Sequence, residues 1–206
     1  MGGADTASGL IAAALRLAEE RGWRAVSVAA AAREAGIDLP AARAAFPSKT
    51  AILLAFGRMA DQAVLTDIPS EGAVRDRLFD LLMRRFDALQ AHRAGVLAVL
   101  RALPGDPASA VALACATRRS MRWMLDAAGA ETGGLFGELR VRGLVAVWLW
   151  AARAWERDDS ADLSATMAAL DTALSRAESA ARWLSGRPAP KPDADAEPEA
   201  DAAEPI

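Results

Sequence analysis

Residues 26–49, VSVAAAAREAGIDLPAARAAFPSK, constrain the fold of this chain more than any other stretch of it. Ser27 is a good N-cap for a first short helix over residues 28–35, because its hydroxyl can accept a bond from an N–H of the first turn. Gly36 ends that helix, since glycine adopts the left-handed conformation without steric cost. The first half of the stretch therefore predicts a two-turn helix that stops sharply.

The second half of the stretch predicts another short helix. Asp38 is a candidate N-cap, and Pro40 fits the first turn, where its missing N–H removes no bond. The helix runs to Phe46 and stops at Pro47, after which Ser48 caps a longer helix. Two short helices joined by a tight turn indicate a helix-turn-helix, although the same pattern also fits an ordinary helical hairpin.

Small side chains in this pair of helices allow the two to cross closely. We expect the core-facing positions to be Ala31, Ala32, Ala35, Ala41 and Ala44.

Residues 10–56 resemble the DNA-binding domain of TetR-type transcriptional repressors. The resemblance is carried by an apolar first helix, the Phe-Pro-Ser-Lys element and the segments around the turn: Gly22-Trp23, Val26-Ser27-Val28, Ala35-Gly36-Ile37 and Phe46-Pro47-Ser48-Lys49. It implies contact with an operator in double-stranded DNA. The DNA-binding residues that it implies are Ser27, Arg33, Asp38, Ala41, Ala42, Arg43 and Lys49.

The recognition helix departs from the family pattern in three places. Arg43 stands where the family usually has a phosphate-binding tyrosine, and the chain has no tyrosine. Ala45 replaces a residue that is often aromatic, and Asp38 replaces the usual serine or threonine of the turn. Base readout needs donors and acceptors such as Arg, Asn or Gln, whereas alanines contact only thymine methyl groups.

Composition predicts an all-α protein of about nine helices. Just over half of the 206 residues are apolar, alanine dominates, and strand-forming residues are sparse. We expect a helix-turn-helix domain over residues 1–50 and a helical ligand-binding and dimerisation domain over residues 51–184. The Pro- and acid-rich segment 185–206 should be a disordered tail, as should residues 1–6.

The charge of the chain is uneven and its N-terminal part is nearly neutral. The net charge is −3, of which residues 185–206 carry −4, from six acids and two bases. Residues 1–50 carry only +1, from six bases and five acids. This is a small electrostatic footprint for a DNA-binding domain, since phosphate contacts supply most non-specific affinity.

The larger domain contains bulky apolar residues of the kind that line ligand cavities. A core role fits each of them as well, and the expectation of a pocket rests on the family resemblance, which implies a small apolar or lipid-like ligand in this domain. The candidate lining residues are Phe79, Leu82, Phe86, Leu97, Cys115, Met121, Trp123, Met124 and Trp148. The four arginines of the helix over residues 72–90, including Arg85, are expected to form a solvated face.

The helix expected over residues 136–157 is apolar on every side at its centre, residues 143–152. Ten residues are too few to span a bilayer, which needs about twenty, so we expect no integral membrane segment. A helix that is apolar all round must be buried all round, which suggests contact with a second subunit. The family resemblance likewise implies a homodimer formed by the last two helices, the second of them starting near Ser160.

No catalytic constellation, metal site or cofactor motif is recognisable. Gly133-Gly134 lacks the rest of a phosphate loop, and the single histidine, His92, has no evident nucleophile or metal-binding neighbour. We therefore expect neither an enzyme nor a bound cofactor. The lone Cys115 excludes an internal disulfide, which fits a reducing cytoplasm.

A second resemblance offers an alternative function. Residues 73–178 are similar to the C-terminal domain of the TetR-like lipid-binding accessory protein of ubiquinone biosynthesis. The similarity is carried by Trp155-Glu156-Arg157-Asp158-Asp159-Ser160 and by Thr166-Met167-Ala168-Ala169-Leu170-Asp171. It implies a protein of the same fold that does not bind DNA, carries a lipid or quinone, and presents it to a hydroxylase.

Overall fold

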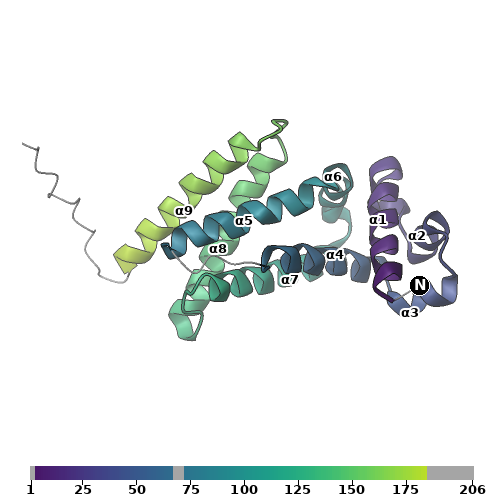
Figure 1. The fold of residues 1–206 in the computed structure, drawn as a ribbon, viewed down its shortest axis with the longest axis horizontal. Helices are drawn as coiled ribbons and strands as arrows, with labels where there is room; N and C mark the ends of the chain where they lie inside the picture. The colour runs from purple at the N-terminus through teal and green to yellow at the C-terminus, as the bar shows by residue number, and fades with distance from the viewer. Residues whose placement is uncertain (1–2, 67–71, 185–206) are drawn as a thin grey trace, which may run out of the picture.

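The computed structural model describes residues 3–66 and 72–184, and within these ranges the chain is built from helices without strands (Figure 1). The predicted disorder of residues 185–206 lies outside the described residues. The α-helices are α1 (Gly3–Arg21), α2 (Val28–Ala35), α3 (Leu39–Ala45), α4 (Lys49–Val64), α5 (Val74–Gln90), α6 (Arg93–Ala102), α7 (Pro107–Ala127), α8 (Gly134–Trp155) and α9 (Ser164–Leu184). Two short 3₁₀ segments, Trp23–Ala25 and Leu103–Gly105, complete the order. The all-α prediction is confirmed.

Most helix boundaries follow the local signals in the sequence. The Ser27 hydroxyl accepts a bond from the N–H of Ala30, and Gly36 ends α2 in the left-handed conformation at φ 65°. Two predicted starts are wrong. The first helix begins at Gly3 rather than after residue 6, and α9 begins at Ser164 because residues 160–163 form a loop that binds its first turn.

The N-terminal end of the molecule, here called the head, consists of α1–α3 with the first half of α4 (Figure 1). Its core is dominated by alanine and leucine side chains around the buried Trp23 and Phe46. Helix α6 packs on α1 across Gly95, where an added Cβ would lie 2.5 Å from the carbonyl oxygen of Leu15. Only glycine at position 95 permits the two helices to lie this close. The contact joins α1 of the head to α6, which lies outside it.

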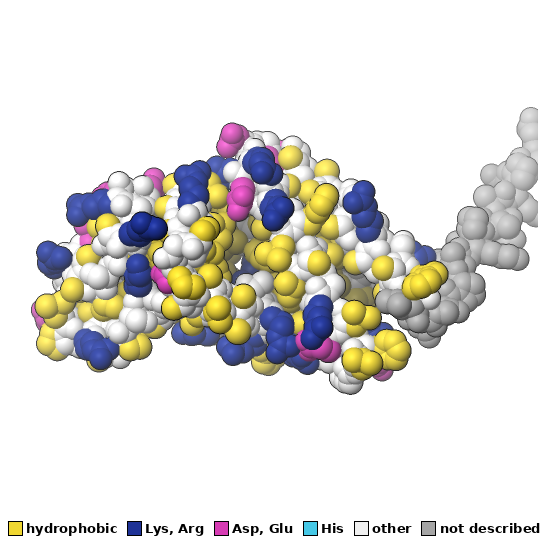
Figure 2. All heavy atoms as spheres, turned by 180° about the vertical axis from the view of Figure 1, so that it is seen from behind, with side chains coloured by type: hydrophobic (Ala, Val, Ile, Leu, Met, Phe, Trp, Pro, Cys, Tyr) yellow, Lys and Arg dark blue, Asp and Glu magenta, His cyan; other side chains and the backbone are white. Residues whose placement is uncertain are grey.

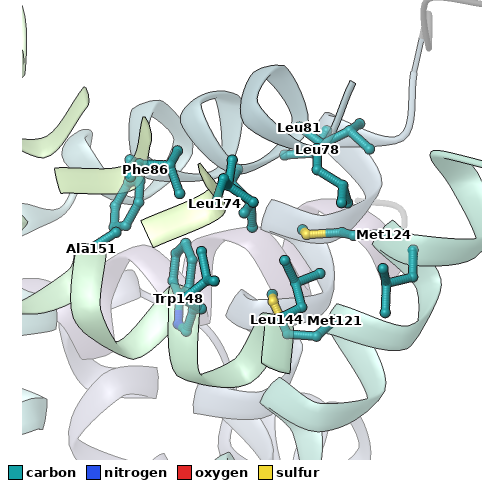
Figure 3. Close-up of a cluster of buried hydrophobic side chains, with 14 of the residues drawn as sticks. Leu78, Leu81, Phe86, Met121, Met124, Leu144, Trp148, Ala151 and Leu174 are labelled. Carbon is teal, nitrogen blue, oxygen red and sulfur yellow. The ribbon is translucent and has the colours of Figure 1, made fainter. Parts of the chain in front are cut away.

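The remainder of the molecule, here called the body, is formed by α5–α9 with the second half of α4 (Figure 1). Figure 3 shows its core, in which the aromatic rings of Phe86 and Trp148 lie face to face beside leucine and methionine side chains. Helix α4 therefore belongs to both cores: it gives Ile52, Leu53 and Phe56 to the head and Val64 to the body. The predicted boundary at residues 50 and 51 stays a prediction.

Candidate DNA-contacting head and its link to the body

The outward side of α3 is the surface by which this head would approach DNA. Leu39, Pro40, Ala41, Arg43 and Ala44 are exposed, whereas Ala42 has no exposed surface. Two expectations are therefore wrong. Ala42 cannot contact DNA, because it and Phe46, one helical turn later, form the inward side. Ala41 and Ala44 face outward and are not core residues.

The cations near this surface differ in how freely they can reach a phosphate. Arg43 is exposed, and its Nη1 donates to the carbonyl oxygen of Pro47 at 3.1 Å. Arg33 is exposed on α2, where its Nε donates to the carbonyl oxygen of Ala29 at 3.4 Å. The Lys49 ammonium lies 5.1 Å from the ring centroid of Trp23 and donates to the Trp23 carbonyl at 3.1 Å. One donor of the Lys49 ammonium is thus used to hold the start of α4 against Trp23 of the head.

The turn between α2 and α3 is exposed and acidic. Asp38 occupies the N-cap position of α3, as predicted, but its side chain accepts no capping bond. Its carboxylate lies on the exposed face beside α3, where it opposes the approach of a phosphate. On the face drawn in Figure 2, lysine and arginine side chains are scattered over head and body and form no continuous basic stripe on the head.

Helix α4 is fastened to the body by polar contacts near both of its ends. Near its start, the hydroxyls of Thr50 and the buried Ser109 of α7 lie 3.0 Å apart. Near its end, Asp61 pairs with Arg85 of α5 and accepts a bond from the hydroxyl of Ser120 on α7. These contacts join both ends of α4 to helices of the body.

The expectation that Arg85 is solvated is wrong. Its side chain is 7% exposed, its guanidinium lies 5.0 Å from the Trp148 ring centroid, and burial lowers its pKa to about 10. The residue retains its charge near neutral pH, so the body holds a buried ion pair inside an apolar cluster. Its burial could not be predicted from the sequence, because Arg85 is one of four similar arginines on the same helix.

Of the side chains expected to line a ligand pocket, seven lie in or against the body core and two are exposed. Leu82, Phe86, Leu97, Met121, Met124 and Trp148 lie in the body core, and the partly buried Phe79 packs against them. They fill one another's space: the rings of Phe86 and Trp148 stack at 4.4 Å between centroids. Cys115 is exposed and Trp123 is 60% exposed, so the assignment of these two residues to the pocket is wrong. Both lie on the outer side of α7.

The loop between α8 and α9 is built around a second buried charge, Asp158. Its carboxylate accepts bonds from the N–H and hydroxyl of Ser160 and from the N–H and hydroxyl of Thr166, which lower its pKa well below the usual range. Arg93 donates to three carbonyl oxygens of the same loop, and the Trp155 indole donates to Gln90 at 2.9 Å. The segment that carries the second resemblance thus holds the start of α9 through these hydrogen bonds.

The outer sides of α8 and α9 expose large apolar side chains. Leu149 and Trp150, at the centre of α8, are more than half exposed, and Trp183 of α9 is 82% exposed. The start of α8 adds Leu135, Phe136 and Leu139. The all-round apolar centre of α8 is therefore buried on one side only within a single chain.

Within residues 3–66 and 72–184, no group of three His, Cys, Asp or Glu side chains is arranged to hold a metal ion. No single described helix is long and apolar enough to cross a membrane. The pair α6 and α7, bent by 119° at its junction, meets the length and composition requirement together.

Comparison with known proteins identifies the head and the fold. Residues 10–56 match the family model "Bacterial regulatory proteins, tetR family". A TetR transcriptional regulator from Nitrosomonas europaea ATCC 19718 superposes with a TM-score of 0.68 at 21% identity, over 84% of this chain and 98% of that one. A tetR-family regulator from Streptomyces coelicolor gives 0.61 at 22% identity, over 89% and 85%. No curated protein sequence matches the chain.

The head thus matches the TetR family model over residues 10–56, and the described helices have the fold of TetR regulators. The resemblance to TetR regulators that was predicted from the Phe-Pro-Ser-Lys element is confirmed. At such low identity the solved structures establish the fold alone.

Proposed function

We propose that this protein is a transcriptional regulator that binds an operator in double-stranded DNA through α3 and is controlled by a small apolar ligand in the body. The observation that carries the proposal is the exposed side of α3, with Arg43 at its centre, on a head that matches a family of bacterial regulatory proteins. Arg43 and Arg33 would contact phosphates, and Lys49 would offer its remaining donors.

The proposed assembly is a homodimer through α8 and α9. Its support is the exposed apolar surface that includes Leu149, Trp150 and Trp183, since large apolar patches of this kind mark interaction sites. A two-fold dimer would place two α3 helices in successive major grooves about 34 Å apart. A ligand that prefers one spacing of the heads would then change operator affinity.

The test is binding of the purified full chain to a pool of genomic DNA fragments at low and moderate salt. We expect enrichment of a palindromic site and an affinity that falls steeply with salt, because phosphate contacts release counterions. Arg43→Ala should weaken binding to every fragment. Arg119→Ala removes the same charge from an exposed position on α7 and serves as the matched control.

A second candidate function is a lipid or quinone carrier that does not bind DNA. It is favoured by the nearly neutral head and by the single cation, Arg43, on the outward side of α3. Under this alternative the DNA experiment yields no enrichment even at low salt. Mass spectrometry of the natively purified protein would then detect a bound lipid.

A further inference from the structure

Two charged side chains of the described structure are buried, and they differ in how well they are satisfied. The carboxylate of Asp158 receives the four donors of Ser160 and Thr166 described above. Arg85 pairs with Asp61 through Nη1, but its buried Nε has no hydrogen-bond partner among the described residues. Since a guanidinium has five N–H donors, Arg85 retains donors for a further acceptor.

The partner of Arg85 belongs to the helix that connects head and body. Asp61 lies in the last turns of α4, while Arg85 lies on α5 and Ser120 on α7. A movement of α4 away from α5 would leave the arginine charge buried without a counter-charge, which is strongly unfavourable. A neutral ligand cannot compensate for this loss, whereas a ligand carboxylate can pair with a guanidinium through two parallel bonds.

We propose that the effector of this protein is an apolar organic acid whose carboxylate replaces Asp61 at Arg85 and so releases α4 from the body. The proposal rests on the regulator function proposed above and specifies the chemical class of its ligand. It makes Arg85 the anion-binding residue of the body and Asp61 its internal competitor.

The side chains around Arg85 are apolar, so we expect the part of the acid beyond its carboxylate to be apolar as well. The guanidinium lies over Trp148, which stacks on Phe86, and Met121 and Met124 belong to the same cluster (Figure 3). Methionine is unbranched and flexible, so these two side chains can change rotamer when an alkyl or aryl chain enters the cluster. The displaced Asp61 is already 19% exposed and can turn toward water.

The first experiment compares acids with their own methyl esters, using decanoate and 4-phenylbutyrate as probes. Binding to the full chain is measured by calorimetry and by tryptophan fluorescence, without DNA. We expect saturable binding of at least one acid and binding of its ester that is weaker by about tenfold or more, the scale of a charge-assisted pair. Equal binding of acid and ester, or no binding of either acid, overturns the proposal.

The second experiment uses variants that change the internal competition. Asp61→Asn keeps the hydrogen bond with Ser120 but removes the competing charge, and we expect it to tighten acid binding by about tenfold as Arg85 becomes fully available. Asp61→Leu combined with Arg85→Met removes both charges, a change that buried pairs often tolerate, and should abolish the preference for acid over ester.

A control variant tests whether any lost carboxylate has the same effect. Glu138→Gln removes the carboxylate that accepts from Arg118 and Arg122 on the surface of α7 and α8, and it should leave acid affinity unchanged. An Asp61→Asn variant that binds the acid no more tightly than the native chain contradicts the competition. Because no DNA is present, failure of operator binding leaves these results intact, and failure of acid binding leaves the DNA test intact.

Discussion

The cores of the head and the body are packed with side chains of different size. The head core holds many alanines, including Ala31, Ala32 and Ala42, and no charged side chain. The body core is built from large side chains such as Phe86, Trp148 and Met124, and it encloses Arg85. Small side chains let the head helices cross closely and fix their positions, whereas long and flexible side chains leave the body able to rearrange.

This difference separates two tasks within one chain. The head core packs α3 through small side chains, and the body core contains the Arg85–Asp61 ion pair at which we propose that a ligand acts. Helix α4 joins the two, because its first half packs in the rigid core and its second half holds Asp61.

Breaking the buried ion pair on one side should give the largest loss of stability. Asp61→Leu leaves Arg85 buried without a counter-charge, and we expect a loss of about 3–5 kcal/mol in the free energy of unfolding. Combining it with Arg85→Met should restore most of that loss, because the remaining core is apolar. Urea denaturation of both variants measures the difference. A double variant as unstable as the single one would show that Asp61 acts through Ser120 rather than through Arg85.

The carboxylate of Asp158, just before α9, should give the body a pH-dependent contribution to stability. Asp158→Asn weakens up to four charge-assisted bonds, and we expect a loss of about 2–3 kcal/mol at neutral pH. The pKa of Asp158 is lower in the folded than in the unfolded state, where it is about 3.9. The carboxylate therefore stabilises the fold fully above the unfolded-state pKa, and this contribution disappears as the pH falls toward the folded-state pKa. The difference between native chain and variant should therefore stay constant from pH 7 to about 5 and shrink in more acidic solution.

A change in side-chain size should distinguish the two cores directly. Ala42→Leu places a large side chain at a position with no exposed surface, and overpacking should cost about 1–3 kcal/mol. Met124→Leu exchanges side chains of similar volume in the body and should cost below about 1.5 kcal/mol. Thermal unfolding of both variants tests the contrast. If the body variant proves the less stable, the flexible-body interpretation is wrong.

The sequence predicted what local chemistry decides and missed what only the tertiary structure decides. Ser27, Gly36 and Pro47 mark helix ends through their own backbone and side-chain preferences, and the structure confirms all three. The burial of Ala42 was missed because Ala41, Ala44 and Ala45 offer the same small apolar side chain, so the pattern did not show which alanine faces inward.

The candidate site was less predictable for the same physical reason. Arg85 is buried because Asp61 lies opposite it on another helix, and no periodicity within α5 reports that partner. Cys115 and Trp123 are apolar residues at helical spacing, which is equally compatible with a buried and an exposed side of α7. Asp158 was noted only through a resemblance, although the groups that donate hydrogen bonds to its carboxylate lie within eight residues along the chain.

The smallest predicted effect compares two N-caps in the head. Ser27 accepts a bond from the N–H of Ala30, so Ser27→Ala should cost about 1 kcal/mol. Asp38 occupies the same position of α3 without such a bond, and Asp38→Ala should leave the free energy of unfolding nearly unchanged. The removal of its charge should instead strengthen DNA binding, since a carboxylate beside α3 repels phosphate. A stability loss at Asp38 equal to that at Ser27 would show that its carboxylate caps α3 in solution, and the acidic turn would then be structural rather than a barrier to DNA.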